Sequence, residues 1–291
     1  MAFPGRMDLH MHTTVSDGTD TPAELLGKVK EAGLLLFSVT DHDAFKGCLN
    51  VISELEPGCP AFMTGVEFSC MDSHGDYHIL GYGYDPDSPE MKELTKINHD
   101  LRVSKLEKRL QLLSEIHGIE FPDYEVEKLR QLENPGKPHL GALMAEYGYA
   151  QTKDSAIADC LNDLWVWDET TAPDTVIDCI LKSGGIPVLA HPVFADGDEV
   201  LDEEEMEKRL LWLMDMGLEG VEGFYSLFSR DQNKMMLALA EKYSLYVTAG
   251  SDYHGRLKNI SLADTGYKEG ENLPEGMRRF LKDISDRIIR S

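Results

Sequence analysis

The sequence alternates short apolar segments, rich in β-branched residues, with stretches in which apolar residues recur at helical spacing. The stretch 21–32 begins with Thr-Pro and carries Glu24, which is a favourable helix start. Residues 203–216 and 230–243 also have a helical period. Strands that alternate with helices predict a parallel α/β sheet or barrel. The seven apolar segments are 7–12, 34–40, 61–67, 77–82, 186–190, 218–224 and 245–249.

The alternation breaks between the fourth and fifth segments, which are separated by roughly a hundred residues. This region is mostly helical in pattern and carries many charges. We therefore predict that residues 91–175 form a helical insertion, or cap domain, in a barrel domain made of residues 1–90 and 176–291. A second interpretation stays open, in which the region supplies two helices of the ordinary outer ring and a long loop.

Net charge, cysteine content and hydropathy exclude several classes of protein. The net charge is −24, from 28 basic and 52 acidic residues, so we expect no extended nucleic-acid surface. A small phosphorylated substrate, such as a nucleotide, is compatible with this charge because bound divalent cations would dominate the local field. The five cysteines form no CxxC motif, and the N-terminus lacks the apolar region of a secretory signal, which predicts a cytoplasmic protein. No apolar run of ~18 residues occurs, so we expect no contact with a membrane.

The chemically informative residues lie at the ends of the apolar segments. The first segment carries His10 and His12, which the two-residue period of a strand places on one face, and Asp17 follows in a turn. His-x-His alone is a weak signal, but Ser-Asp-Gly after it makes the signal much stronger. In parallel barrels the carboxyl ends of the strands converge on one mouth, where active sites lie. The other candidate metal ligands are His42, Glu67, His78, His191, Asp252 and His254.

Six histidines and three carboxylates exceed the about four to six ligands that one ion takes, so a cluster of bridged divalent cations accounts for them. A lone histidine such as His78 would more often be a hydrogen-bonded core residue, but the five other histidines at segment ends favour the metal interpretation. These donor types suit Mn, Fe or Zn. Asp8, Asp41 and Asp43 are expected to orient ligands or to serve the fold, and Glu222 could face the mouth.

The order of these motifs resembles that of the PHP (polymerase and histidinol phosphatase) family. The resemblance covers residues 7–95 and 176–266, and the insertion resembles that of stand-alone members that act on nucleotides, such as 3′,5′-nucleoside bisphosphate phosphatases. It implies a distorted seven-stranded (β/α)7 barrel with a trinuclear site, whose nine ligand positions are all present here. The family pattern gives Glu222 no ligand role.

The resemblance also implies how the nine ligands divide among three ions. One ion would take His10, His12, Glu67 and Asp252. A second would share Glu67 and add His78 and His191, and a third would take Asp17, His42 and His254.

Hydrolysis of a phosphate ester needs an activated water and neutralised phosphoryl oxygens, which a multi-metal cluster supplies. We therefore predict a phosphoric ester hydrolase (EC 3.1) that acts on phosphate monoesters of nucleotides, of the 3′,5′-nucleoside bisphosphate or short-oligonucleotide type. A metal-bound water or hydroxide would be the nucleophile, with Glu67, Asp252 and His254 in support. No GxSxG-type nucleophile motif is present. Two alternatives stay open: a phosphatase of histidinol phosphate or another small metabolite, and a non-catalytic metal-binding module.

Substrate contacts are expected from the insertion. Lys137 and His139 lie in a Gly-Lys-Pro-His stretch that resembles a Gly-Arg-Pro-His stretch of the nucleotide-acting members, with lysine in place of arginine. A lysine can hold phosphate as a point charge, but it cannot form the bidentate hydrogen bonds of a guanidinium. The alternative is a helix-start turn with a solvated lysine.

Overall fold

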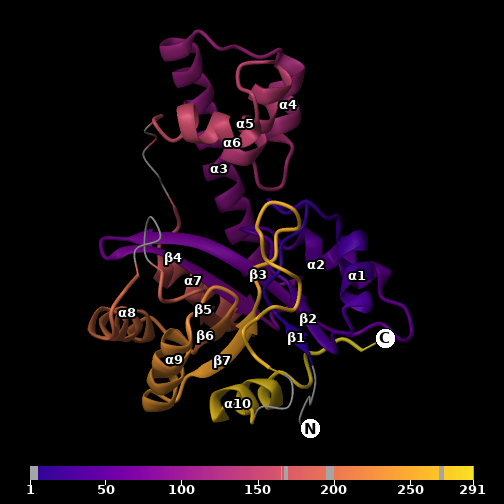
Figure 1. Cartoon of the computed structure of the whole chain (residues 1–291), viewed down its shortest axis with the longest axis vertical. Helices are drawn as coiled ribbons and strands as arrows, with labels where there is room; N and C mark the ends of the chain where they lie inside the picture. The colour runs from indigo at the N-terminus through magenta and orange to yellow at the C-terminus, as the bar shows by residue number, and fades with distance from the viewer. Residues whose placement is uncertain (1–5, 165, 167–169, 195–199, 269–271, 291) are drawn as a thin grey trace. The chain divides into compact units, whose positions relative to one another are not determined.

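The computed structural model describes residues 6–164, 166, 170–194, 200–268 and 272–290 (Figure 1). The chain divides into two compact units, Met1–Leu94 with Thr171–Ser291, and Thr95–Thr170. The second unit begins and ends a few residues inside the predicted insertion, 91–175. No helix in the described residues is long and apolar enough to cross a membrane.

The first unit is a seven-stranded barrel, as predicted. Its strands follow one another around the sheet in chain order. The barrel closes where Leu9 donates to the carbonyl of Ala249 (3.0 Å) and Asp252 donates to that of His10 (2.8 Å). The strands are β1 Met7–Asp8, β2 Leu36–Val39, β3 Ala61–Asp72, β4 Gly75–Tyr82, β5 Ile186–Leu189, β6 Gly220–Tyr225 and β7 Tyr246–Gly250.

The direction of β4 corrects the prediction of a parallel sheet. β4 runs antiparallel to both β3 and β5, while the other paired strands are parallel. The reason is the connection: Asp72 pairs with Gly75, so only Ser73 and His74 join β3 to β4. A parallel neighbour would need a crossover of about a dozen residues or more, which the short spacing between these strands excludes.

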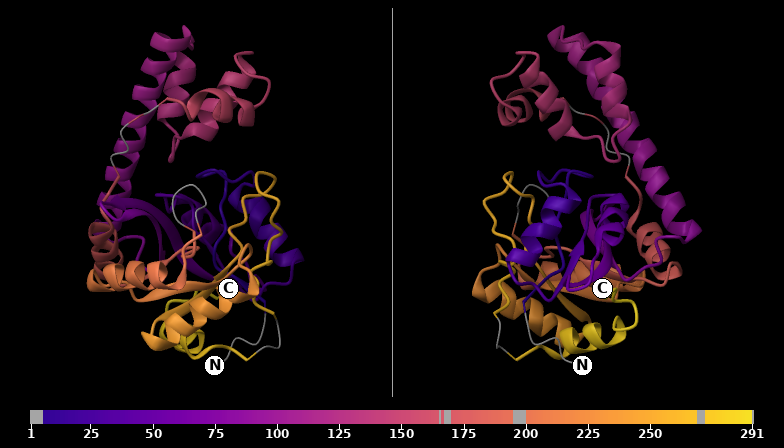
Figure 2. Two further views of the ribbon diagram at one scale, coloured as in Figure 1. Left: turned by 60° about the vertical axis from the view of Figure 1, so that its left-hand side comes forward. Right: turned by 90° about the vertical axis from the view of Figure 1, so that its right-hand side faces the viewer.

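Helices cover the outside of the barrel (Figures 1 and 2). Apolar side chains fill the space between the helices and the sheet. The first helix begins as its sequence predicts, because Thr21 and Glu24 form a reciprocal capping box. The helices of this unit are α1 Pro22–Glu31, α2 Lys46–Glu54, α7 Pro173–Lys182, α8 Glu203–Asp215, α9 Arg230–Lys242 and α10 Glu275–Asp283.

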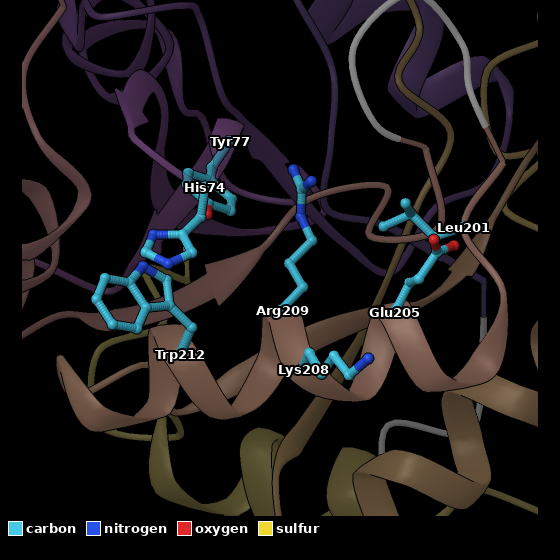
Figure 3. Close-up of a pocket in the computed structure, with 7 residues that line it drawn as sticks. All are labelled: His74, Tyr77, Leu201, Glu205, Lys208, Arg209 and Trp212. Atoms are coloured by element: carbon cyan, nitrogen blue, oxygen red, sulfur yellow. The ribbon is translucent and has the colours of Figure 1, made fainter.

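The turn end of the β3–β4 hairpin packs against α8 (Figure 3). The indole of Trp212 lies against the imidazole of His74, with ring centroids 4.1 Å apart, and its Nε1–H donates to Asp72 at 2.7 Å. The guanidinium of Arg209 lies 4.4 Å from the ring centroid of Tyr77. These contacts hold a hairpin that extends beyond the short strands of the barrel, and His78 lies on its second strand.

The second unit is helical and has its own apolar core. Among the residues that are buried in this core are Leu113, Leu140 and Leu161. The helix α3 begins in the first unit and continues into the second. The elements are α3 Pro89–His117, α4 Asp123–Arg130, α5 Lys137–Glu146, α6 Lys153–Ala156 and the π-helix η1 Ile157–Leu161.

Candidate metal centre

Glu67 of β3 lies at the centre of the histidine cluster and is 1% exposed. Five imidazole nitrogens lie 3.0–3.2 Å from its two carboxylate oxygens. A single carboxylate therefore touches histidines from five separate positions in the chain. These histidines are His10, His12, His42, His78 and His191.

His10 and His12 follow β1, which is shorter than the predicted segment 7–12. The chain stays extended there, because Met11 forms a parallel bridge with Tyr253. The Nε2 atoms of both histidines lie 3.1 Å from Glu67 Oε2, so the two rings face the same side as the two-residue period predicts. Asp252 Oδ1 lies 3.6 Å from the first Nε2 and 3.4 Å from the second.

His78 reaches the mouth for a reason that the sequence analysis did not anticipate. It lies in the first half of β4 and pairs with Ser69, so it does not end its strand. Because β4 runs against its neighbours, its beginning lies beside the ends of β3 and β5. There, His78 Nδ1 lies 3.1 Å from His191 Nε2, just after β5.

A second group of donors forms around Asp17. His254 Nε2 lies 3.3 Å from Asp17 Oδ1, and His42 Nε2 lies 3.9 Å from Asp17 Oδ2. The ring of His12 stacks on that of His254 with centroids 4.0 Å apart, which connects this group to the one around Glu67. All nine predicted ligands thus come together in the first unit.

The donor chemistry of this cluster fits divalent cations. In each of three groups, one ligand atom per residue lies within 4.8 Å of all the others. Among the described residues, His10 Nε2, His12 Nε2 and Glu67 Oε2 are buried without a hydrogen-bond partner, which is costly unless a cation takes that place. The groups are His10, His12, Glu67 and Asp252; His12, Asp17, His42 and His254; and His42, Glu67 and His78.

A family model for the PHP domain matches residues 8–165, which is more than half of the chain. The chain belongs to the PHP family. The resemblance inferred from the motifs is therefore confirmed. His191, Asp252 and His254 lie beyond the matched residues, and their place in the PHP site rests on the geometry above.

Three curated relatives match most of the chain. An enzyme of Chromobacterium violaceum named 3′,5′-nucleoside bisphosphate phosphatase is 25% identical over 290 residues, covering 98% of both chains. A phosphoribosyl 1,2-cyclic phosphate 1,2-diphosphodiesterase of Eggerthella lenta is 30% identical over 273 residues, covering 87% of this chain and 95% of its own. A 5′-3′ exoribonuclease of Haemophilus influenzae is 26% identical over 271 residues, covering 89% of this chain and 96% of its own.

Two solved structures share the fold of this chain. An amidohydrolase of Chromobacterium violaceum with bound sulfate aligns with a TM-score of 0.80 at 24% identity, covering 98% of each chain. A predicted metal-dependent phosphoesterase of Bifidobacterium adolescentis aligns with a TM-score of 0.76 at 25% identity, covering 95% of this chain and 96% of its own.

Two of the candidate ligands have strained backbones. The φ angle is 30° at His191 and 60° at Asp252, in the left-handed region that side chains other than glycine disfavour. Such positions cost about 1–3 kcal/mol each and persist where the surrounding structure imposes them, often at functional sites. In this PHP site the strain occurs at the two turns, after β5 and β7, that direct ligand atoms inward.

Electrostatics keep the carboxylates of the PHP site ionised. Burial alone would raise the pKa of Glu67, but its interactions with His10, then His42 and His78, hold this pKa well below its usual value. Burial would likewise raise the pKa of Asp252, yet His10 and the contact with His12 hold it far lower. Both groups are therefore anionic donors throughout the physiological pH range.

The supporting carboxylates contact the segments that carry the ligands. Asp41 accepts hydrogen bonds from the backbone N–H of Thr13 (2.7 Å) and the hydroxyl of Ser16 (2.8 Å), between His12 and Asp17. Asp8 accepts from the backbone and the hydroxyl of Ser251, next to Asp252. Asp43 accepts from the backbone of Ser69, at 3.1 Å.

Sequence reasoning missed two residues of the site. Asp252 Oδ2 accepts hydrogen bonds from the hydroxyl of Tyr225 at 2.9 Å and the ammonium of Lys258 at 2.6 Å. No spacing or motif separates these two residues from other tyrosines and lysines of the chain. Lys258 therefore places a positive charge beside the candidate ligand Asp252.

Lys137 and His139, the predicted substrate contacts, belong to the second unit. Lys137 is the first residue of α5 and donates a hydrogen bond to Asn162 Oδ1 at 3.0 Å. His139 lies in the first turn of the same helix. Their contact with a substrate stays a prediction.

Proposed function

We propose that this PHP-family chain is a metal-dependent phosphoesterase that hydrolyses phosphate monoesters of nucleotides, of the 3′,5′-nucleoside bisphosphate or short-oligonucleotide type. The observation that carries the proposal is the position of Glu67, buried with five imidazole nitrogens within 3.2 Å of its oxygens. The names of the relatives support the substrate class, since two of the three described above refer to nucleotide or RNA substrates.

The nine clustered residues would hold about three divalent ions, such as Mn, Fe or Zn. Bound there, these ions would activate a water molecule as nucleophile and neutralise the phosphoryl oxygens. The chain's own residues fix the donors. Glu67 contacts histidines through both of its oxygens, and Tyr225 and Lys258 hold one oxygen of Asp252. The other oxygen, Oδ1, faces His10 and His12.

A second candidate function is hydrolysis of a cyclic phosphodiester of a ribose phosphate. It is favoured by the relative from Eggerthella lenta, which is 30% identical and is named for this substrate. The same metal donors would serve both reactions, because each needs an activated water and a stabilised leaving oxygen.

A panel of substrates tests these functions with one purified protein. It should contain adenosine 3′,5′-bisphosphate, a short RNA with a 5′-phosphate, a cyclic ribose phosphate and histidinol phosphate, each assayed with added Mn²⁺. We expect the highest kcat/KM with a nucleotide. Preference for the cyclic diester would favour the second candidate, and preference for histidinol phosphate would contradict both.

Replacing Lys137 with alanine tests the predicted substrate contact. We expect KM for the preferred nucleotide to rise about ten- to a hundredfold, because a lost hydrogen bond to a charged group costs about 1.5–3 kcal/mol. Hydrolysis of p-nitrophenyl phosphate should change far less, since this substrate has no second phosphate or base. Steady-state kinetics with both substrates measure the difference.

Lys128→Ala is the matched control, because Lys128 lies in the same unit and its side chain is 67% exposed beside Glu125. It should leave both substrates unaffected. Equal losses on both substrates in Lys137→Ala would indicate damage to folding or metal binding. No loss on either would identify Lys137 as a solvated helix-start residue.

A further inference from the structure

We infer that Glu222 is a positioning residue of the metal centre, whose carboxylate directs the proton of His10 to Nδ1 and fixes the backbone of His191. This inference rests on the proposed metal-dependent function. It assigns a role to a carboxylate that belongs to none of the three donor groups found among the described residues.

The two oxygens of Glu222 contact two different ligand segments. Glu222 lies in β6 and is 0% exposed. Its Oε1 lies 3.1 Å from His10 Nδ1, and its Oε2 accepts the backbone N–H of His191 at 2.8 Å. One buried side chain thus connects the segments after β1 and β5, which are far apart in the sequence.

The contact with His10 determines which edge of the imidazole is free. A carboxylate only accepts hydrogen bonds, so His10 donates its Nδ1–H to Glu222. The lone pair is then on Nε2, which lies 3.1 Å from Glu67 Oε2 on the other edge of the ring. A histidine that ligates a metal usually donates its second ring N–H in this way, which fixes its tautomer and makes it a stronger ligand.

The contact with His191 acts on the backbone. His191 has a φ of 30°, which is unfavourable for a residue with a side chain. A charge-assisted hydrogen bond from its N–H to Glu222 stabilises this conformation. His191 Nε2 then lies 3.2 Å from Glu67 Oε1, whereas His10 Nε2 lies 3.1 Å from Oε2, so Glu222 positions one histidine at each oxygen of Glu67.

Gly250, the last residue of β7, leaves the space that this arrangement requires. A Cβ atom at this position would lie 2.2 Å from the Cβ of His10 and 2.4 Å from Oε1 of Glu222. Any side chain there would separate the two groups.

The substitution Glu222→Gln separates a positioning role from a merely structural one. The site needs two acceptors, and a carboxamide has only one. If its oxygen keeps the bond to His191, its NH₂ group faces His10 Nδ1 and forces the proton onto Nε2, where a cation would bind. We expect the affinity for Zn²⁺, measured by competition with a chelator, to fall about ten- to a hundredfold.

Glu219→Gln is the matched control, because it makes the same change just before β6 at an exposed side chain. It should bind Zn²⁺ as the wild type does. In zinc-loaded protein with ¹⁵N-labelled histidine, the wild type and this control should show the proton of His10 on Nδ1. Glu222→Gln should lose that signal, whereas a carboxylate that only stabilised the fold would leave it in place.

If Glu222→Gln does not fold, Glu222→Asp decides the question, because it keeps the charge but is one methylene shorter. It should also bind Zn²⁺ more weakly, and binding equal to that of the wild type would overturn the inference. Unchanged binding and an unchanged Nδ1 signal in a folded Glu222→Gln would overturn it too. A wild-type chain that binds no Zn²⁺ would overturn the proposed function together with this role.

Discussion

Replacing Glu67 with alanine is expected to lower kcat/KM by about a thousandfold or more, the largest effect of any single substitution at the centre. Its two oxygens lie against five histidines, so its removal disturbs donors on both sides of the cluster. Metal ions contribute several kcal/mol of transition-state stabilisation, and each 1.36 kcal/mol corresponds to about tenfold in rate. Initial rates with the preferred nucleotide and metal content by elemental analysis measure the effect.

The fold should survive this change, because the apolar core of the barrel lies below the site. Circular dichroism and thermal unfolding check this point. Glu56→Ala is the control, since it makes the same change in the same unit at an exposed side chain that lies before β3. Turnover at the wild-type rate in Glu67→Ala would refute a role for Glu67 in joining two ions.

Local sequence patterns were sufficient to select the nine candidate ligands, although not the residues that support them. His10 and His12 lie two residues apart in extended chain, and this spacing alone places both rings on one side. The residues after β2, β5 and β7 could be found because a polar group that directly follows a buried strand lies at the barrel mouth. Each of these inferences depends on a few neighbouring residues, so tertiary structure did not need to be known.

Features that depend on partners distant in sequence could not be predicted in the same way. The position of His78 depends on the reversed direction of β4, which follows from the two-residue connection to β3. The third predicted segment ends at residue 67, whereas β3 extends to Asp72, whose side chain accepts a hydrogen bond from Trp212 of α8. A strand that is stabilised by a helix more than a hundred residues away leaves little periodicity in its own sequence.

The supporting residues illustrate the same limit. Tyr225, Lys258 and Glu222 act through contacts with Asp252, His10 and His191, and each pair is brought together only by the folded barrel. Glu222 did give a signal, since a carboxylate inside a buried strand segment needs buried partners. The sequence offers no means to identify those partners.

Removal of metal is expected to abolish hydrolysis, and addition of Mn²⁺, Fe²⁺ or Zn²⁺ to the chelator-treated and desalted protein should restore it. Three anionic carboxylates and six histidines converge in one place, but these groups supply neither a nucleophile nor a means to neutralise phosphoryl oxygens on their own. The same ions should raise the unfolding temperature, because they bind the folded chain more tightly than the unfolded one.

The number of metal ions needed to restore activity and to raise the unfolding temperature tests the cluster directly. Elemental analysis at each added equivalent, compared with activity and unfolding temperature, shows how many ions the centre needs. Activity that appears only after more than one equivalent is bound would agree with donors arranged in three overlapping groups that share His12, His42 and Glu67. Saturation of activity at one equivalent would leave two groups without a catalytic role. Full activity in a protein that contains no bound transition metal would contradict the proposed function itself.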